Sequence, residues 1–322
     1  MIRNIIFDIG NVLTDYRWEG FLADKGFDAE MIQKIAKASV MHPAWAEYDR
    51  GTWTDEQVLA AFVKDAPQLE QELRKSKGVT PEEARKTLAH NNYFGTMLVK
   101  MGVADALLGG ATYSTADTVR PALQLIKTKP GSNLVSSVYI LSRPSATGQK
   151  ELLAMADCAI NIKPNEDELA EIATSAADCA KIFGIDPKVA FLSYSTLGSG
   201  KGEDVDKMRH AAEKAKLREP GLPIEGEIQF DAAVAPQVAK IKAPDSEVAG
   251  QANTFIFPDI NSGNIGYKIA QRLGNFEAYG PVLLGLNASI NDLSRGCNAT
   301  EVYTMAIITA ALAEDKKPEA AK

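Results

Sequence analysis

Three segments of the sequence place a cation near the expected start of a helix. Arg120 lies in "YSTADTVRPALQ", Arg295 in "NDLSRGCNATEVYTMAIITAALA" and Lys201 in "YSTLGSGKGEDVDKM". A helix start carries partial positive charge, so a cation there is unfavourable by roughly 0.3–1 kcal/mol unless an anion joins it. Arginines that converge with free backbone N–H groups form a natural phosphate site. For any one of these cations alone, a neighbouring carboxylate or solvent is the better explanation, and it is the presence of three that favours an anion site.

Two of these segments also carry pairs of residues with the spacing of a capping box. Ser114 with Asp117, and Asn298 with Glu301, are placed to satisfy each other's backbone N–H groups at a helix start. Pro121 is typical of the first turn of a helix. It therefore predicts a helix start directly beside Arg120.

The glycine-rich segment around Lys201 is not a Walker A motif. No glycine stands five residues before Gly200, and glycine rather than serine or threonine follows Lys201. A tight turn without a ligand and a phosphate contact are equally compatible with this segment. Gly263 and Gly266, in "FPDINSGNIGYKIAQRL", similarly indicate close backbone approach before a helix.

The segments that must position these residues follow a repeated strand-turn-helix order. Strands are predicted in "RNIIFDIG", "ADALLGG", "VSSVYIL", "MADCAINI", "VAFLSYS" and "TFIFPDI". One helix is predicted to start at Thr80 and Pro81 and to run through "EEARKTLAHNNYFGTMLVKMG". Another is capped by Asn165 and Glu168 and ends at Gly184. The order predicts an α/β fold with a parallel sheet covered by helices on both faces and with ligands at the carboxyl ends of the strands.

Composition disfavours several classes of protein. The length of 322 residues suffices for two domains, and 45% hydrophobic with 24% charged residues is an ordinary globular composition. The net charge of -7 disfavours nucleic acid as the main partner. The spacing of Cys158, Cys179, Cys297 and the three histidines indicates neither disulfides nor a zinc site. No apolar run reaches the roughly 18 to 20 residues of a membrane span, and the chain starts without a signal sequence. We therefore expect a cytoplasmic protein with no membrane partner.

Long strings between Glu72 and Leu312 resemble the phosphate acetyltransferase family. They are "NYFGTMLVKMG", "STADTVRPALQLIKTKPG", "LSYSTLGSGK", "KAPDSEVAGQAN", "GNIGYKIAQRLGNFEAYGP" and "NDLSRGCN". The resemblance implies reversible conversion of acetyl-CoA and phosphate into CoA and acetyl phosphate, with no metal or cofactor required. It also implies two α/β/α domains of the isocitrate/isopropylmalate-dehydrogenase-like type with a cleft between them, and a homodimer.

The resemblance also implies roles for particular residues. Arg120 and Arg295 would hold the phosphoryl group, and Ser294 would hydrogen-bond the reacting groups as a tetrahedral intermediate forms. Glu301 would remove the proton of the CoA thiol, whose free pKa is about 8.5, although it is explained equally well as the acid of its own capping box. The resemblance places Arg74 in the cleft, and we expect substrate contacts from Arg74, Ser114, Thr115, Lys201 and Asn264. Cys297 is expected to be structural or to lie next to the substrate.

Four positions depart from the usual sequence of that family. Glu301 stands where aspartate is common, and the additional methylene shifts the carboxylate by about a bond length, a scale at which misplacement can cost on the order of 10²-fold in rate. Tyr113 replaces a usual histidine, Leu197 a usual lysine and Leu284 a usual glutamine. Each of these three replacements lies near a turn that is expected to face ligand.

Residues 1–71 resemble instead the start of a haloacid-dehalogenase-type phosphatase. "IIFDIGNVLTD" would be the nucleophile strand with Asp8, although the usual second aspartate is Gly10. That family also needs a serine or threonine, a lysine and an acidic pair that binds magnesium, and the chain changes identity before any of these. Asp8 would face an anionic substrate with nothing to neutralise its charge, so we expect residues 2–10 to form a buried parallel strand. The alternatives to acetyl transfer are a phosphatase that uses Asp8 and an inactive chimera that binds CoA or phosphate.

The two resemblances together predict the domain boundaries. Residues 1–71 would be an incomplete N-terminal domain, and residues 315–322 a disordered tail. Residues 72–129 with 284–314 would form acetyltransferase domain I, and 130–283 domain II. A position left empty beside "ADALLGG" would expose apolar surface and a backbone edge, both of which favour aggregation.

Overall fold

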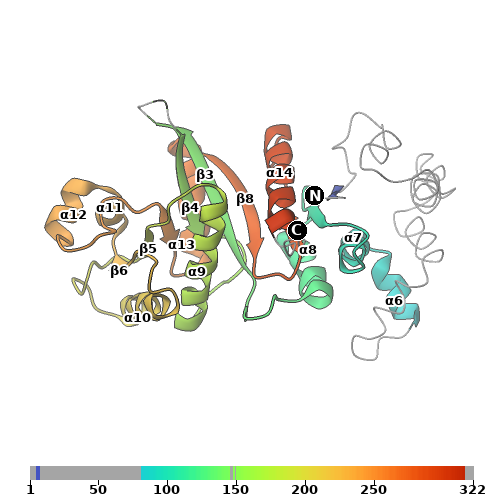
Figure 1. The fold of residues 1–322 in the computed structure, drawn as a ribbon, viewed down its shortest axis with the longest axis horizontal. Helices are drawn as coiled ribbons and strands as arrows, with labels where there is room; N and C mark the ends of the chain where they lie inside the picture. The colour runs from blue at the N-terminus through green and yellow to red at the C-terminus, as the bar shows by residue number, and fades with distance from the viewer. Residues whose placement is uncertain (1–4, 8–80, 146–147, 149, 316–322) are drawn as a thin grey trace, which may run out of the picture. The chain divides into compact units, whose positions relative to one another are not determined.

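The computed structural model describes residues 5–7, 81–145, 148 and 150–315 (Figure 1). The chain forms two compact units, which are 1–127 with 288–290 and 295–322 (unit 1), and 128–287 with 291–294 (unit 2). Asp8, Gly10, Arg74, Thr80 and the tail 316–322 lie outside the described residues, so the expectations for them stay predictions. Within the described ranges, no helix combines the length and the apolar character that a membrane crossing needs.

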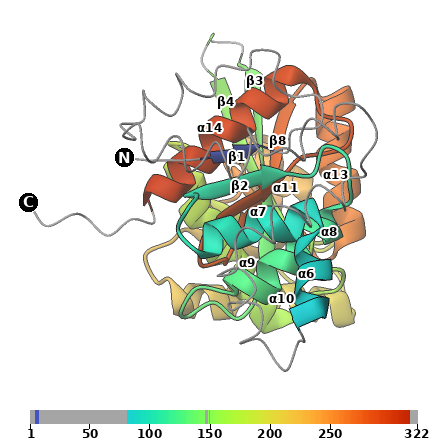
Figure 2. The same ribbon diagram turned by 90° about the vertical axis from the view of Figure 1, so that its right-hand side faces the viewer.

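Unit 1 contains a three-stranded sheet with the order β1-β2-β9. Its described elements are β1 (Ile5–Phe7), α6 (Pro81–Leu88), α7 (Asn91–Lys100), β2 (Ala106–Gly109), α8 (Thr115–Pro121), the π-helix η1 (Ala122–Ile126), β9 (Ser289–Asp292), which the division between the units crosses, and α14 (Ala299–Asp315). β1 runs parallel to β2, with Ile5 opposite Ala106 and Phe7 opposite Leu108. The N-terminal strand therefore fills the position beside "ADALLGG". Figure 2 shows α14 and α7 on opposite sides of β2, and both helices contact that strand.

The single helix predicted from Pro81 onward is two helices. α6 starts at Pro81 as predicted but ends at Leu88, and α7 starts at Asn91 after His90, which is extended with ψ 127° and makes no side-chain cap. Histidine and asparagine are weaker helix formers than Leu88 and Ala89, which precede them. The sequence "HNN" therefore interrupts the helix that the surrounding pattern predicts.

Unit 2 contains a six-stranded sheet with the order β6-β5-β7-β4-β3-β8. Its strands are β3 (Ser136–Pro144), β4 (Lys150–Ala156), β5 (Val189–Leu192), β6 (Ile224–Ile228), β7 (Thr254–Ile256) and β8 (Glu277–Leu284). Its helices are α9 (Glu166–Ile182), α10 (Glu203–Arg218), α11 (Phe230–Val234), α12 (Pro236–Lys242) and α13 (Ile260–Leu273).

The sheet of unit 2 is mixed, so the prediction of a parallel sheet is wrong for part of it. β4, β5, β6 and β7 are parallel neighbours, whereas β3 is antiparallel to both β4 and β8. The connection between β3 and β4 spans only residues 145–149, which permits antiparallel pairing but is too short for a parallel crossover. Of the strand predicted in "MADCAINI", only Met155 and Ala156 belong to β4, and the residues from Asp157 onward form a turn.

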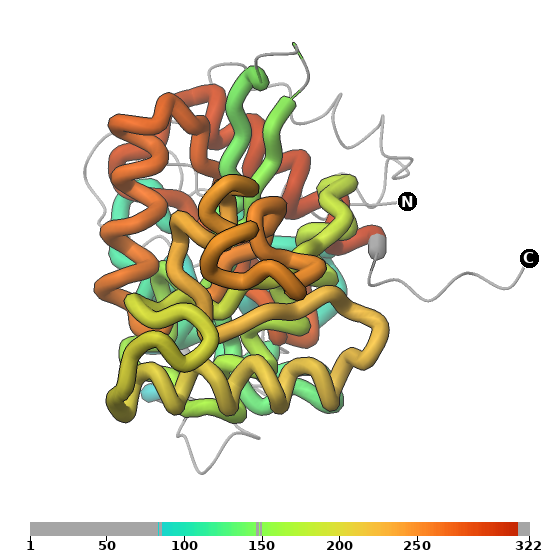
Figure 3. Tube along the Cα trace, turned by 90° about the vertical axis from the view of Figure 1, so that its left-hand side faces the viewer, coloured from blue at the N-terminus to red at the C-terminus, as the bar shows by residue number. Residues whose placement is uncertain are grey.

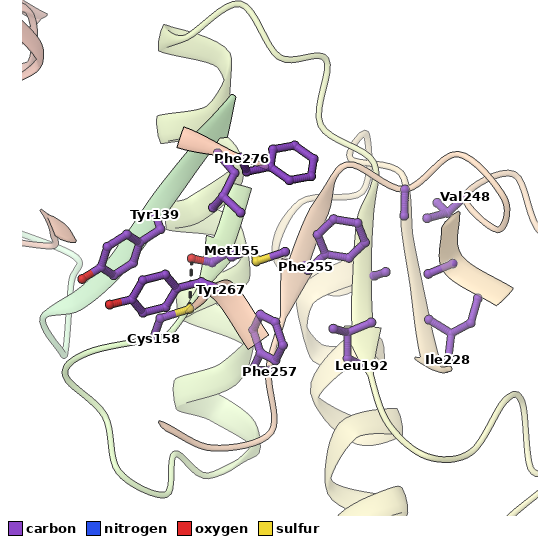
Figure 4. Close-up of a cluster of buried hydrophobic side chains, with 14 of the residues drawn as sticks. Tyr139, Met155, Cys158, Leu192, Ile228, Val248, Phe255, Phe257, Tyr267 and Phe276 are labelled. Atoms are coloured by element: carbon purple, nitrogen blue, oxygen red, sulfur yellow. Dashed lines mark hydrogen bonds between the residues drawn. The ribbon is translucent and has the colours of Figure 1, made fainter. Parts of the chain in front are cut away.

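Helices cover both faces of this sheet, as predicted. α9 and α13 both contact β3 and β4, and the two views in Figures 1 and 3 show these helices on opposite faces. A large core cluster of unit 2, drawn in Figure 4, joins Met155, Phe255 and Phe257 from the strands and the ends that follow them to Tyr267 of α13. Tyr139 of β3 stacks on Tyr267 with ring centroids 4.0 Å apart and an interplanar angle of 15°. This core fixes the parallel strands whose carboxyl ends carry the turns of unit 2.

The predicted capping of α9 is confirmed. Asn165 Oδ1 accepts from the backbone N–H groups of Asp167 and Glu168, each at 3.0 Å, and Glu168 Oε2 accepts from the Asn165 N–H at 2.8 Å. One face of the helix, with Leu169, Ile172, Ala173 and Ala176, is buried, and Gly184, at φ 75°, follows the end of the helix. Local sequence signals therefore determine both ends of this helix.

Glu171, on the buried face of α9, holds the segment that leads into β3. Its carboxylate accepts hydrogen bonds from the Ser132 hydroxyl at 2.8 Å, from the Asn133 backbone N–H at 2.7 Å and side-chain amide at 3.0 Å, and from the Leu134 N–H at 3.4 Å. Arg218 Nη1 lies 3.6 Å from Oε2. Burial raises the pKa of Glu171, but these hydrogen bonds outweigh burial and hold the pKa below its ordinary value.

We expect Glu171→Gln to lower the free energy of unfolding by about 1.5–3 kcal/mol at pH 7, because a charged acceptor of several hydrogen bonds is lost. Since the folded pKa of Glu171 is lowered, its contribution is present above the unfolded pKa of about 4.3 and is lost as pH falls through the folded pKa. Urea unfolding at pH 7 and at stepwise lower pH measures this. Glu213→Gln, at an exposed position on α10, is the control. Equal losses in the two variants would contradict the prediction.

Candidate active site

α8 begins at the pair Ser114 and Asp117, as the sequence predicts. The Asp117 carboxylate accepts hydrogen bonds from the Ser114 hydroxyl at 2.6 Å and from the Ser114 backbone N–H at 3.3 Å. The hydroxyl contributes most to holding the pKa of Asp117 below its ordinary value, while burial acts in the opposite direction and Arg120 adds to the lowering. Ser114 is extended, so the helix starts at Thr115.

Arg120 lies at the end of α8, and the prediction that a helix starts beside it is wrong. Ser114 already starts the helix at Thr115, and Pro121 is the last residue of α8 rather than part of a first turn. Arg120 Nη1 is 3.5 Å from Asp117 Oδ1, and 58% and 43% of the two side chains are exposed. An ion pair this exposed contributes roughly 0–1 kcal/mol, so an anion can compete with Asp117 for the guanidinium.

The start of α14 carries the second predicted capping box, which is confirmed. The Asn298 backbone N–H donates to Glu301 Oε2 at 3.1 Å, and the Glu301 N–H donates to Asn298 Oδ1 at 3.0 Å. Ser294 and Arg295 are exposed just before this helix, and Cys297 is half-buried between them and the cap. Arg295 is therefore a cation close to a helix start, as predicted.

The glycine-rich turn after β5 uses its own backbone donors. All six backbone N–H groups from Ser195 to Gly200 donate to acceptors within residues 193–199 or to Glu227. Glu227 is fully buried, and its Oε1 accepts from the Gly198 N–H at 2.7 Å and from the Ser195 hydroxyl at 2.9 Å. The structure thus favours a tight, internally satisfied turn over a backbone cradle for phosphate.

Lys201 follows this turn, at the start of α10, and its side chain is exposed. The Tyr194 hydroxyl donates to the Lys201 carbonyl at 2.8 Å, which fixes the backbone of the lysine. The first turn of α10 carries Glu203, Asp204 and Asp206. These acids offset the positive end of the helix, so Lys201 contributes a side-chain charge but does not mark an open helix terminus.

Asp157 organises the turn after β4, at the same edge of the sheet. Its carboxylate accepts from the backbone N–H groups of Ala159 at 2.9 Å, Ile160 at 3.2 Å and Asn161 at 3.0 Å, and from the Ser137 hydroxyl. Neither Asp157 nor Glu227 is among the residues predicted from the sequence. A carboxylate at the end of a strand is the signal for Asp157, but the strand predicted in "MADCAINI" runs past it.

Asn264 and the glycines of α13 hold this helix against the Asp157 turn. Asn264 Nδ2 donates to the Cys158 carbonyl at 3.0 Å, and Lys268 Nζ donates to Asn264 Oδ1 at 2.7 Å. A Cβ at Gly263 would collide with the Asp157 carbonyl, and one at Gly266 would lie 2.9 Å from the Phe257 ring. The close approach that the glycines predict is therefore made within unit 2, between α13 and the residues that follow β4 and β7.

Comparison with known proteins decides the family. Residues 57–310 match the family described as "Phosphate acetyl/butaryl transferase". The chain belongs to this family. A phosphate acetyltransferase of Bacillus subtilis (strain 168) is 57% identical over 267 residues, which are 83% of this chain and 78% of that protein. One of Staphylococcus aureus (strain Mu50 / ATCC 700699) is 46% identical over 308 residues, 93% of this chain and 88% of that protein.

A solved structure supports the same assignment and the fold. The crystal structure of a phosphotransacetylase from Streptococcus pyogenes superimposes with a TM-score of 0.74 and 50% identity, over 87% of this chain and 93% of that chain. The family match begins at residue 57, before the junction predicted at residue 72. The acyltransferase similarity therefore reaches into the segment that the sequence analysis assigned to a phosphatase-like domain.

Within this acyltransferase family member, the predicted site residues are distributed over both units. Unit 1 contains Ser114, Thr115, Arg120, Arg295, Cys297 and Glu301, and unit 2 contains Lys201, Asn264 and Ser294. Of the departures from the usual family sequence, the Tyr113 hydroxyl lies against Gly109 at the end of β2, and Leu197 is 49% exposed at φ 47°. In the described part of the chain, no three His, Cys, Asp or Glu side chains are grouped as metal ligands.

We expect Ser114→Ala to destabilise the protein by about 0.5–2 kcal/mol at neutral pH, because the Asp117 carboxylate loses the hydrogen bond that the Ser114 hydroxyl donates to it. Since the folded pKa of Asp117 is lowered mainly by Ser114, the contribution of this pair is present above the unfolded pKa of about 3.9 and is lost as pH falls through the folded value. The difference in unfolding free energy between wild type and variant therefore narrows in acid. Ser175→Ala, inside α9, serves as control, and a difference that does not change with pH would contradict this account.

Proposed function

We propose that this chain catalyses reversible acetyl transfer between CoA and phosphate, in which acetyl-CoA and phosphate give CoA and acetyl phosphate. The observation that carries the proposal is the 57% identity, over 83% of the chain, to a phosphate acetyltransferase. The family description covers acetyl and longer acyl transfer. The acetyl group is favoured because the relatives that are 57% and 46% identical are both acetyltransferases.

In the direction that forms acetyl-CoA, the CoA thiolate attacks the carbonyl carbon of acetyl phosphate. A C–S bond forms, the tetrahedral intermediate collapses, and the bond from the acetyl carbon to the phosphate oxygen breaks, so that phosphate leaves with the electron pair. Arg120 and Arg295 hold the phosphoryl oxygens and offset their charge, and Ser294 hydrogen-bonds the reacting groups. The exposure of both arginines supports this assignment.

Glu301 is proposed as the base that takes the thiol proton. Its cap bond to Asn298 engages Oε2, and the second oxygen of a carboxylate can accept a proton at the same time. The cap then orients the base, because it fixes the side chain at the start of α14. The longer side chain compared with aspartate is accommodated by the same cap.

The side chains proposed to contact substrate differ in the hydrogen bonds that they already make within the chain. Ser114 and Asn264 would contact substrate while they hold Asp117 and the Cys158 carbonyl. Lys201 would contribute charge beside the glycine-rich turn. Contacts from Thr115, Cys297 and Arg74 are proposed from the family resemblance alone.

The finer architecture is also proposed. Units 1 and 2 would be the two α/β/α domains of an isocitrate/isopropylmalate-dehydrogenase-like fold, with residues 72–129 and 284–314 in domain I and 130–283 in domain II. Residues 1–56, which precede the family match, would be of phosphatase-like origin and supply β1, whereas residues 57–71 belong to the acyltransferase match. The protein would act in the cytoplasm as a homodimer, with CoA as substrate and no metal or cofactor.

We expect Arg295→Ala to lower kcat/KM for acetyl phosphate by about 10²–10³-fold, the loss typical of one preorganised donor to developing charge. Consumption of the CoA thiol, with acetyl phosphate as donor, measures this. Arg143→Ala is the matched control, because Arg143 pairs with Glu151 and lies over the Phe276 ring in the β3–β4 region. Asp8→Asn should leave acetyl transfer unchanged. Phosphatase activity with magnesium that Asp8→Asn abolishes, without any acetyl transfer, would overturn the proposed function.

The two roles of Glu301 can be separated with a matched cap elsewhere in the chain. Glu168 caps α9 with Asn165 by the same pair of reciprocal bonds that Glu301 makes with Asn298. We expect Glu301→Gln and Glu168→Gln to lower the melting temperature by similar amounts, while only Glu301→Gln lowers kcat, by roughly 10²–10⁴-fold. Equal kcat values in the two variants would show that Glu301 only caps α14 and is not the base.

A further inference from the structure

The helix that carries Arg120 is interrupted by a proline directly after it. Pro121 ends α8, and the chain continues as the π-helix η1. Because proline has no N–H, the Asp117 carbonyl, four residues earlier, lacks its helical donor. A π-helical turn next to a functional residue is a recurrent arrangement in proteins. The backbone around Arg120 therefore needs support from outside its own helix.

A side chain of α7 supplies the donor that Pro121 lacks. Asn92 Nδ2 donates to the Asp117 carbonyl at 2.9 Å. The same Asp117 holds the Ser114 hydroxyl and the Arg120 guanidinium through its carboxylate. The amide of Asn92 thus completes the hydrogen bonding of the residue that neighbours Arg120 on the preceding turn.

The next residue of α7 holds the other side of the proline. The Tyr93 hydroxyl donates to Gln124 Oε1, in η1, at 2.7 Å. Burial raises the pKa of Tyr93, while the positive charge of Arg120 and the bond to Gln124 act to lower it, in keeping with an arginine close to this ring. Asn92 and Tyr93 therefore bracket Arg120 and Pro121 from both sides.

The helix that carries this pair is itself fixed. The Thr96 hydroxyl donates to the Asn92 carbonyl at 2.6 Å, and Met97 is fully buried. A Cβ at Gly95 would lie 3.0 Å from the Leu107 side chain of β2, so α7 lies close against the sheet. Tyr93 packs against the buried cluster that includes Met97 and Leu125. Because α7 is packed on the sheet, its side chains hold Asp117 and Gln124, on either side of Arg120, at fixed positions relative to β2.

We propose that Asn92 and Tyr93 are positioning residues for Arg120, and that they fix its guanidinium for the phosphoryl group. This role rests on the proposed acetyl transfer, in which Arg120 binds phosphate or the phosphoryl group of acetyl phosphate. Neither residue touches substrate. Asn92 must act as a hydrogen-bond donor, so an apolar residue of the same size cannot replace it, whereas a backbone N–H restored at position 121 can.

The test is a double-mutant cycle between Asn92 and Pro121. Asn92→Leu removes the amide donor at nearly constant size, and Pro121→Ala restores an N–H that can reach the Asp117 carbonyl. We expect Asn92→Leu to raise the KM for acetyl phosphate about tenfold with little change in the KM for CoA. Pro121→Ala alone should be close to wild type, and the double variant should recover most of the lost affinity.

Two further variants keep the result interpretable. Tyr93→Phe removes only a hydroxyl and should raise the KM for acetyl phosphate about threefold. Asn253→Leu removes a comparable bond in unit 2, from Nδ2 to the Asp186 carbonyl at 2.7 Å, and should leave the ratio of the two KM values unchanged. If Asn92→Leu does not fold, Tyr93→Phe and the double variant decide the outcome.

Inorganic phosphate alone separates this proposal from the proposed function. The shift in melting temperature that phosphate produces should be reduced in Arg120→Ala and Asn92→Leu and recovered in Asn92→Leu/Pro121→Ala. If the variants show these phosphate-induced shifts but wild type transfers no acetyl groups, the proposed function fails and the positioning role stands. The positioning role is overturned if wild type transfers acetyl groups and Asn92→Leu has the same KM values as wild type. It is also overturned if Asn92→Leu loses affinity for CoA and phosphate equally and Pro121→Ala does not restore it.

Discussion

The backbone N–H groups of the turns need acceptors, and carboxylates of the chain itself supply many of them. Asp157 serves the turn after β4, Glu227 the turn after β5, and Asp117 the start of α8. A carboxylate that accepts such bonds fixes its turn and also occupies donors that could otherwise bind an anion. In the proposed function, an anionic substrate would then be recognised mainly by side-chain cations. This constraint is why the proposed site depends on Arg120 and Arg295 rather than on a glycine-rich backbone cradle.

Features determined by a few neighbouring residues could be predicted from the sequence. The capping boxes at Asn165 and Asn298 are present, because their spacing alone satisfies the first N–H groups of a helix. The family could also be predicted, since long strings carry it. Gly263 indicated close approach correctly, although its partner, the carbonyl of Asp157, could only come from the fold.

Features that depend on residues distant in sequence could not be predicted. β6, with the sequence "IEGEI", and β8, with "EAYGPVLL", contain glycine, glutamate or proline, and their pairing overrides these weak local preferences. The role of Glu227 requires the turn after β5 to lie beside β6. The prediction that Pro121 starts a helix is wrong, and the donor that compensates for its missing N–H, Asn92, lies 25 residues from the Asp117 carbonyl that it serves. Tertiary partners decide each of these cases.

The pairing of β1 with β2 bears on the order in which the chain can fold. Ile5 lies opposite Ala106, so this ladder closes a loop of about a hundred residues, and β9 joins the same sheet only after residue 288 has been synthesised. All six strands of the other sheet come from one continuous stretch, from Ser136 to Leu284. Because closing longer loops costs more entropy and slows folding, the sheet that begins the chain is the one expected to finish last. During translation, β1 therefore remains unpaired until β2 has been synthesised, and the sheet stays incomplete until β9 follows. We expect chaperones to bind the chain mainly in that interval.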